Sequence, residues 1–266
     1  MDRIKQALAK ARQGAGPAWQ PVTVRKRTGL TLLESFEYTR TRAAVLDPAL
    51  MNRNRIVALN KRDPYSSVFD VLRTKILRKM DDNGWHTLAV TSPTPGSGKT
   101  VVSINLAMSV AQQTDRTALL VDLDLRRPKV ASYLGLTGGR SLNDVLRGSA
   151  AVSEAMVNPG IPRLVVIPTY ESEPSPAEAL SSQRGRALIK EMRDRYSDRV
   201  VILDLPPLLH TDDAITVLPD IDCVLLVIGN GEASKAEIED SLRNLPALNI
   251  VGVVLNKAEA SGGSYY

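Results

Sequence analysis

The 266-residue sequence predicts a doubly wound α/β fold with a mostly parallel sheet. After Trp85, short apolar runs alternate with stretches of helical periodicity. The runs are apolar throughout, which is typical of parallel strands that helices cover on both faces. The turn PGSGKT, residues 95–100, joins the first run to the following helix and is of the kind that holds phosphate.

The elements follow from these patterns in chain order. A leading helix is predicted over 63–80, where an Asp-Pro start precedes apolar side chains that recur on one helical face. Strands are predicted at 87–91, 117–123, 164–168, 200–205, 223–228 and 250–255. Helices are predicted between them at 99–113, 141–147, 177–196, 211–218 and 234–245.

The segment ahead of this domain is basic and less regular. Residues 1–62 carry 13 Lys/Arg against 4 Asp/Glu, whereas the remainder carries 21 against 25. Short helices are predicted over 1–12 and around 31–46. We therefore expect a basic N-terminal extension over 1–62, a main domain over 63–257 and a flexible tail over 258–266. A basic arm suits nucleic acid or an anionic membrane surface, and a solvated extension explains the charge equally well.

Composition argues against several classes of protein. The longest apolar runs, such as VLLVIG at 224–229, are far shorter than the roughly 18 residues of a membrane span. The first residues, MDRIKQALAKARQ, mix charged and apolar side chains and do not form a secretory signal. The single cysteine, Cys223, permits neither a disulfide framework nor a cysteine metal site. We expect a cytoplasmic protein.

The turn at 95–100 has the chemistry of a triphosphate site. Glycines let the backbone approach phosphate oxygens, and the helix that follows adds its positive N-terminal end. We expect Lys99 to reach the β- and γ-phosphates and the Thr100 hydroxyl to bind Mg²⁺. The consensus for such loops has glycine where this chain has Pro93. The candidate nucleotide-binding residues of the loop are Thr94, Pro95, Gly96, Ser97, Gly98, Lys99, Thr100 and Val101.

Acidic side chains stand at two further strand ends. ALLVDLDLRRP places Asp122 and Asp124 on the same side of an extended segment, and Asp204 ends the strand in VVILDLPP. A carboxylate at the end of an apolar strand costs free energy unless it is paired, and a phosphate-bound Mg²⁺ ion is a natural partner. For Asp124 taken alone, capping of the next helix is an equally reasonable interpretation.

PGSGKT, LLVDLDLRRP and VVILDLPP together resemble the three Walker-type motifs of bacterial tyrosine kinases of capsule and exopolysaccharide synthesis. The soluble, separately encoded CpsD/CapB type is the nearest match, over about residues 60–257, and the D-x-D-x-R element is the most specific part. The resemblance implies a P-loop NTPase fold of the MinD/ParA-like type. It also implies an ATP- and Mg²⁺-dependent tyrosine autokinase that regulates polysaccharide synthesis and chain length.

The resemblance also implies a role for each motif residue. Lys99 holds the triphosphate and Thr100 holds Mg²⁺. Asp122 accepts the proton of an incoming tyrosine hydroxyl beside the metal, and Asp124 supports the nucleotide and the metal shell. Asp204 holds Mg²⁺, through water. The catalytic set is therefore Lys99, Asp122, Asp124 and Asp204, and the metal set is Thr100, Asp122 and Asp204.

Two further assignments come from the end of the chain. Asn256 stands where related folds contact the adenine edge, and a strand-ending turn residue is the alternative. In SGGSYY the glycines form a tether, and Tyr265 and Tyr266 are the implied phosphate acceptors, offered to a neighbouring subunit. This cluster is shorter than is usual in the family, and a tail without a role is the alternative.

The leading helix departs from the family. Members often carry E-x-x-R-x-x-R there for ring contacts, and alignment on Arg73 gives Ser67, Asp70 and Arg73, so the oligomeric state stays open. The resemblance further implies activation by a membrane chain-length-determinant (polysaccharide co-polymerase) protein, and thus a peripheral position at the inner membrane through that partner. Self-association for phosphorylation in trans is implied as well, and no nucleic-acid partner is expected.

Two rival functions share the nucleotide site. A MinD/ParA-like ATPase has a signature lysine at the loop position where this chain has Thr94, and it lacks a tyrosine tail. A nucleotide-binding regulatory subunit of the polysaccharide export machinery, without kinase activity, is the second rival.

Overall fold

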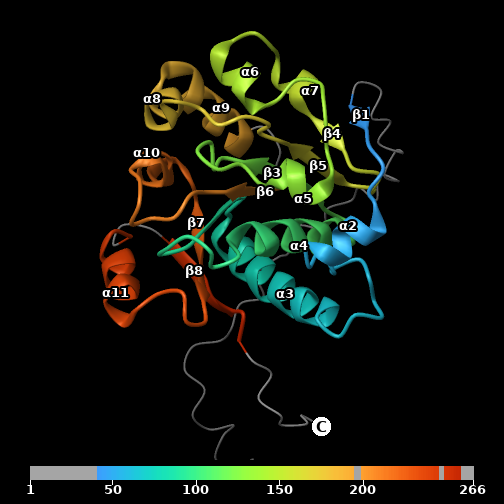
Figure 1. Cartoon of the computed structure of the whole chain (residues 1–266), viewed down its shortest axis with the longest axis vertical. Helices are drawn as coiled ribbons and strands as arrows, with labels where there is room; N and C mark the ends of the chain where they lie inside the picture. The colour runs from blue at the N-terminus through green and yellow to red at the C-terminus, as the bar shows by residue number, and fades with distance from the viewer. Residues whose placement is uncertain (1–40, 195–198, 246–248, 259–266) are drawn as a thin grey trace, which may run out of the picture. The chain divides into compact units, whose positions relative to one another are not determined.

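The computed structural model describes residues 41–194, 199–245 and 249–258. Their strands form one sheet in the order β1-β4-β5-β3-β6-β2-β7-β8, in which neighbours are parallel except for the antiparallel pair β4 and β5 (Figure 1). The strands are β1 (Arg42–Ala43), β2 (Thr87–Thr91), β3 (Thr117–Asp122), β4 (Val157–Asn158), β5 (Leu164–Ile167), β6 (Arg199–Asp204), β7 (Cys223–Gly229) and β8 (Asn249–Asn256). This confirms the predicted doubly wound, mostly parallel α/β fold.

Helices connect the strands on both faces of the sheet. They are α2 (Pro48–Arg53), α3 (Ser66–Asn83), α4 (Lys99–Ala111), α5 (Val130–Leu134), α6 (Leu142–Arg147), α7 (Val152–Ala155), α8 (Pro176–Ser181), α9 (Gln183–Asp194), α10 (Asp213–Val217), the 3-10 helix η1 (Leu218–Asp220) and α11 (Lys235–Arg243). Helices α3 and α4 pack on one face, and α9 lies against the other. No helix of the described part of the chain is both long and apolar enough to cross a membrane.

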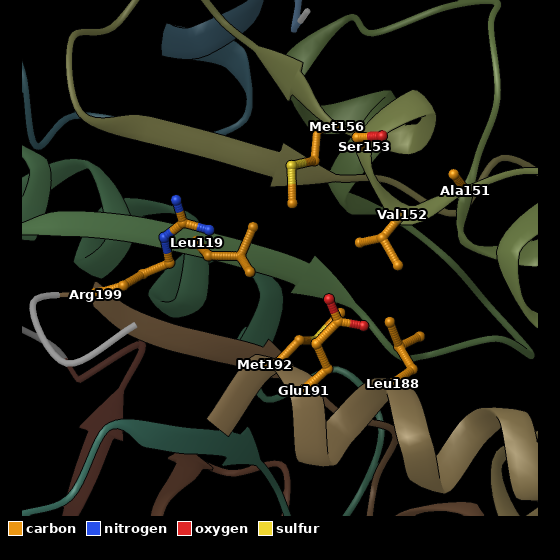
Figure 2. Close-up of a pocket in the computed structure, with 9 residues that line it drawn as sticks. All are labelled: Leu119, Ala151, Val152, Ser153, Met156, Leu188, Glu191, Met192 and Arg199. Carbon is orange, nitrogen blue, oxygen red and sulfur yellow. The ribbon is translucent and has the colours of Figure 1, made fainter. Parts of the chain in front are cut away.

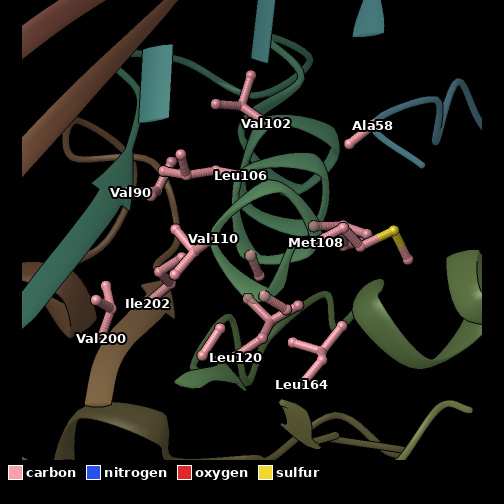
Figure 3. Packing of buried hydrophobic residues seen from close by; sticks show 14 of the residues in the cluster. Ala58, Val90, Val102, Leu106, Met108, Val110, Leu120, Leu164, Val200 and Ile202 are labelled. Carbon is pink, nitrogen blue, oxygen red and sulfur yellow. The ribbon is translucent and has the colours of Figure 1, made fainter. Parts of the chain in front are cut away.

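Helix α4 is the centre of the core. All its residues except Val101 are buried, as expected for a helix that is apolar around most of its circumference. Figure 3 shows Leu106 beside Val90 of β2, and Val110 beside Ile202 of β6. Because the helix is packed on all sides, its first residues hold a fixed position at the carboxyl ends of the strands.

Each of the six predicted strands is confirmed, with ends that differ from the observed strand by no more than one residue. Strands β1 and β4 were not predicted, because two residues are too short to show a pattern. The helix predicted at 31–46 is wrong over its described part, where residues 42–43 form β1. The helix predicted over 1–12 lies outside the described residues.

The helix predicted over 177–196 is two helices. Ser182 has extended backbone (φ −60°, ψ 158°) and separates α8 from α9. Its hydroxyl accepts a hydrogen bond from the Gly185 amide (3.0 Å), so it satisfies one of the free N–H groups at the start of α9. Helix α3 also starts later than predicted, because the Asp63 carboxylate accepts a hydrogen bond from the Tyr65 amide (2.9 Å) in a turn ahead of it.

Packing of the domain begins ahead of residue 63, within the described residues that start at Thr41. Met51, Ile56 and Ala58 belong to the main core, although they fall within the predicted extension. The fully buried Asn105 of α4 fixes this stretch, because its side-chain oxygen accepts hydrogen bonds from the amides of residues 57 and 58 (2.7 and 2.9 Å).

Candidate functional site

The predicted phosphate loop lies between β2 and α4, at the carboxyl end of the sheet. Gly96 and Gly98 both have φ of +83°, a conformation that side-chain-bearing residues rarely adopt. A Cβ atom at Gly98 would overlap the Asn256 amide. The loop therefore needs glycine at position 98 both for its backbone conformation and for its contact with β8.

Lys99 is buried at the first position of α4 and points at two carboxylates. Its Nζ lies 2.7 Å from Asp124 Oδ2 and 3.8 Å from Asp204 Oδ2. Burial lowers the pKa of Lys99, but attraction to Asp204 and Asp124 outweighs burial, and the pKa is raised overall. The ammonium group therefore stays charged at the point where the loop would hold phosphate.

Both oxygens of Asp204 are held by hydroxyls of α4. The Thr100 hydroxyl donates to Oδ2 (2.7 Å) and the Ser103 hydroxyl to Oδ1 (3.0 Å). Burial is the main cause that raises the pKa of Asp204, with Lys99 and Thr100 opposing it in part. Sequence reasoning missed Ser103, although its spacing of three residues from Thr100 places both on one helical face.

Asp122 and Asp124 have different local roles. Asp122 is fully buried, and its Oδ2 accepts hydrogen bonds from the amides of Lys129 (3.1 Å) and Val130 (3.0 Å) at the start of α5. The capping role considered for Asp124 thus falls to Asp122, whereas Asp124 contacts Lys99. Among the described residues, no hydrogen bond joins Asp122 to either Lys99 or Thr100.

Asp122 is nevertheless part of the same charge cluster. It lies opposite Asp204 in the register of β3 and β6. Burial raises the pKa of Asp122 well above its ordinary value of 3.8, and repulsion from Asp204 adds to the effect. Three buried carboxylates therefore surround one lysine.

This cluster fits a divalent cation bound together with phosphate. Its donors are all oxygens, as Mg²⁺ prefers, and the carboxylates outnumber the lysine. The described residues hold no group of three or more His, Cys, Asp or Glu side chains arranged for a metal. A Mg²⁺ ion held by the predicted set, with Thr100 as ligand, Asp204 acting through water and Asp122 nearby, would accordingly take its other ligands from phosphate and water.

Residues at the end of β8 and just after β7 and β8 support the loop from outside. The Asn256 amide donates to the Ser97 carbonyl (2.9 Å), and the Thr94 hydroxyl donates to the Glu232 carbonyl (2.9 Å). Lys257 forms an ion pair with the Glu232 carboxylate. Glu232 was not predicted, because a loop glutamate has no sequence pattern that places it beside a distant turn.

Arg126, the last residue of the D-x-D-x-R element, forms a two-point ion pair with Asp213. The distances are 2.6 Å from Nε to Oδ2 and 3.1 Å from Nη2 to Oδ1. Asp213 is buried at the first position of α10. Lys99 already joins Asp124 to Asp204. The Arg126–Asp213 pair adds a second connection between the segments that follow these two residues.

On the leading helix α3, Asp70 and Arg73, which occupy two of the family's motif positions, form contacts within this chain. Asp70 accepts hydrogen bonds from Lys61 (2.7 Å), Arg73 (3.0 Å) and Ser109 (2.9 Å). Arg73 also donates to the Ser109 carbonyl (3.1 Å). These contacts join α3 to α4. The predicted acceptors Tyr265 and Tyr266 lie outside the described residues.

A second cavity, of about 390 Å³, lies away from this cluster (Figure 2). Leu119, Leu188 and Met192 supply apolar walls between β3 and α9, and Glu191 and Arg199 add charged groups. Arg199 begins β6 whereas Asp204 ends it, so this cavity and the phosphate loop are at opposite ends of the strand.

The loop, the lysine and the oxygen donors define a nucleotide-binding domain of the P-loop class. A family model described as the CobQ/CobB/MinD/ParA nucleotide binding domain matches residues 88–264. This match confirms the MinD/ParA-like P-loop fold that the motifs predicted.

Three proteins narrow the class further. The tyrosine-protein kinase CpsD of Streptococcus pneumoniae serotype 4 is 34% identical over 184 residues, which cover 67% of this chain and 78% of CpsD. The putative tyrosine-protein kinase EpsB of Ralstonia solanacearum is 28% identical over 255 residues, 94% of this chain, and the chain spans only 34% of EpsB. The solved kinase domain of the Escherichia coli tyrosine kinase ETK has a TM-score of 0.72 and 28% identity, covering 85% of this chain and 92% of that domain. The chain belongs to the bacterial tyrosine-protein kinase family.

Proposed function

We propose that the chain is an ATP- and Mg²⁺-dependent protein-tyrosine kinase of capsule or exopolysaccharide synthesis. Its proposed acceptors are Tyr265 and Tyr266 of a neighbouring subunit. The 2.7 Å contact between Lys99 and Asp124 carries this proposal. It joins the phosphate loop to the D-x-D-x-R element, the motif by which the sequence most resembles tyrosine kinases.

The proposed reaction needs positioning and charge neutralisation more than covalent chemistry. Amides of the phosphate loop and Lys99 hold the β- and γ-phosphates, and Thr100 and Asp204 orient the metal side of the nucleotide. Bound Mg²⁺ supplies positive charge that offsets the charge on the transferred group. Asn256 holds the phosphate loop in place through its hydrogen bond to the Ser97 carbonyl. This position beside the loop supports the predicted contact of Asn256 with the adenine of ATP.

In the proposed step, the phenolic oxygen of the acceptor tyrosine forms a bond to the γ-phosphorus. The bond from that phosphorus to the β–γ bridging oxygen breaks, and ADP leaves. Asp122 takes the phenolic proton. Its raised pKa supports this role, because a carboxylate accepts a proton more readily as its pKa approaches the working pH.

Phosphotyrosine formation by the purified full-length protein with ATP and Mg²⁺ tests the proposal, with Lys99→Met as the inactive control. Phosphorylation in trans is tested by mixing Lys99→Met with a Tyr265→Phe/Tyr266→Phe chain. We expect no signal from either variant alone and a clear signal from the mixture. ATP hydrolysis without phosphotyrosine would favour the MinD/ParA-like alternative, and nucleotide binding without turnover a regulatory subunit.

We further propose that a membrane chain-length-determinant protein recruits and activates this kinase at the inner membrane, with the basic N-terminal segment contributing. Deletion of residues 1–38 tests that contribution without removing the core residues Met51, Ile56 and Ala58. We expect the shortened chain to bind ATP normally and to associate less with membranes that contain the partner. Unchanged recruitment would count against a role for the segment.

A further inference from the structure

The loop between β3 and α5 carries three basic side chains, and two of them have no partner among the residues that the structure describes. Arg126 is paired with Asp213. Arg127 and Lys129 are exposed, and their side chains make no hydrogen bond or ion pair with any residue in the described ranges. Exposed cations are usually only solvated, so their position relative to the reacting groups decides whether they have a further role.

The backbone of both residues is bonded to the carboxylates of the proposed catalytic group. The Arg127 amide donates to Asp124 Oδ1 (3.1 Å), and the Lys129 amide donates to Asp122 Oδ2 (3.1 Å). Pro128 between them restricts the backbone further. The backbone that carries these two side chains is therefore held beside Asp122, the carboxylate that is proposed to receive the phenolic proton.

Two acidic side chains near this loop are already paired with other cations. The Glu173 amide bonds to the Leu125 carbonyl (2.8 Å), yet the Glu173 carboxylate pairs with Arg147 (2.7 Å). Asp213 is taken by Arg126. Within the described ranges, Arg127 and Lys129 thus have no ion-pair partner at the carboxyl end of the sheet.

We propose that Arg127 and Lys129 bind acidic side chains beside the tyrosine of a protein substrate other than the tail, because SGGSYY contains no acidic side chain, so that the kinase selects such tyrosines in acidic peptides. This inference rests on the proposed kinase function and names its substrate class. The two residues select and position the peptide, and neither is proposed to touch the transferred phosphoryl group. The effect therefore belongs in KM, with kcat nearly unchanged.

The test compares two synthetic peptides that each contain one tyrosine, flanked by Glu in one and by Gln in the other. With the full-length protein, Mg²⁺ and ATP, we expect a KM about three- to tenfold lower for the Glu peptide at low salt. The ratio falls toward one as salt rises, because the two cations are exposed. Because the wild-type protein alone yields this ratio, the test does not depend on the folding of any variant.

Arg127→Glu/Lys129→Glu should abolish or reverse the preference, and Arg127→Lys/Lys129→Arg should keep it. The matched control is Lys75→Glu/Lys190→Glu, which reverses two exposed lysines on α3 and α9 and should leave the ratio unchanged. Equal KM values for the two wild-type peptides, or a ratio unaltered by the first variant, would overturn the inference and leave the kinase proposal standing. No phosphotyrosine on the peptides or on the tail, in protein that binds ATP, would overturn both.

Discussion

Ser103 illustrates how a single hydroxyl positions the site. It is fully buried and lies 3.0 Å from Asp204 Oδ1. Removal of one donor from a buried carboxylate costs about 1–3 kcal/mol. We therefore expect Ser103→Ala to lower the free energy of unfolding by about that amount and to weaken Mg²⁺-dependent ATP binding, measured by denaturation and by titration calorimetry.

Ser109→Ala is the matched control for this change. Ser109 is equally buried on α4, but its hydroxyl donates to Asp70 (2.9 Å), away from the phosphate loop. It should cost similar stability and leave ATP affinity unaltered. Equal ATP affinities for Ser103→Ala and the wild type would contradict the positioning role of Ser103.

Asp204 gives a prediction about pH. Its pKa in the folded protein is raised above the ordinary 3.8, mainly by burial, so the folded state binds more protons than the unfolded state above that pH. Its contribution to the free energy of unfolding is fully present below pH 3.8 and is lost as pH rises through the raised pKa. Asp204→Asn keeps the shape of the side chain but cannot ionise, so its free energy of unfolding does not fall in this way as pH rises.

Without nucleotide, Asp204→Asn should unfold at a higher temperature than the wild type at pH 7 to 8. The difference should shrink as pH falls toward 3.8 and should vanish below it, where the wild-type carboxyl becomes protonated in both states. Kinase activity should fall by roughly 10- to 100-fold, because a metal-binding oxygen is lost. Thermal melts from about pH 3 to 8 and initial rates check both, and lower stability of the variant at every pH would refute the argument.

The sequence indicated these carboxylates but did not assign their partners. Side chains of an extended segment point alternately to its two sides, so Asp122 and Asp124 lie on the same side whatever conformation the chain adopts after them. Which of them reaches Lys99 depends on where the chain turns afterwards, and the amides of Lys129 and Val130 bring that turn back to Asp122. Such contacts depend on loop conformation, which residue types alone do not fix.

At the scale of elements, prediction succeeded where burial alone sets the pattern. The central parallel strands are covered on both faces, so their apolar runs marked them to within one residue. Elements defined by a single local hydrogen bond were missed, as at Ser182, where a hydroxyl caps α9 and breaks the predicted helix. The packing of residues 51–58 was missed too, because it depends on the distant Asn105.

The contact between α3 and α4 gives the prediction at this scale. Burial raises the pKa of Asp70, but hydrogen bonds from Lys61 and Ser109 and the charges of Lys61 and Arg73 outweigh burial and lower it overall. Asp70→Asn should lower the free energy of unfolding by about 1 kcal/mol at pH 7. The loss should fade as pH falls below 3.8, because the stabilisation is present only while the carboxyl is ionised.

Asp81→Asn, on the same helix, is the control for this change. Asp81 pairs with Arg116 in a half-exposed ion pair, and such pairs contribute about 0–1 kcal/mol. Urea denaturation at pH 7 and pH 3.5 separates the two variants. If Asp70→Asn were no more destabilising than Asp81→Asn, the cluster around Asp70 would not hold α3 to α4.

At the scale of the whole molecule, the site exists only in the folded sheet. Its parts come from α4, from the end of β3 and from the end of β6, and the register pairs Asp122 with Asp204. The unfolded chain has no such arrangement, so bound nucleotide stabilises the folded state alone. At 100 times the Kd this linkage is worth about 2.7 kcal/mol.

We therefore expect Mg²⁺ and ATP together to raise Tm by about 5–10 °C, from about 2–4 °C per kcal/mol for a domain of this size. ATP without Mg²⁺ should give a smaller rise, because its phosphates then meet three buried carboxylates with only Lys99 to offset them. Lys99→Met should lose most of the shift while it melts cooperatively without nucleotide. Scanning calorimetry of the wild type and the variant, with and without Mg²⁺, measures each difference. An equal rise with and without the metal would mean that the carboxylates do not surround the bound phosphates, and the assignment of Thr100 and Asp204 would then be wrong.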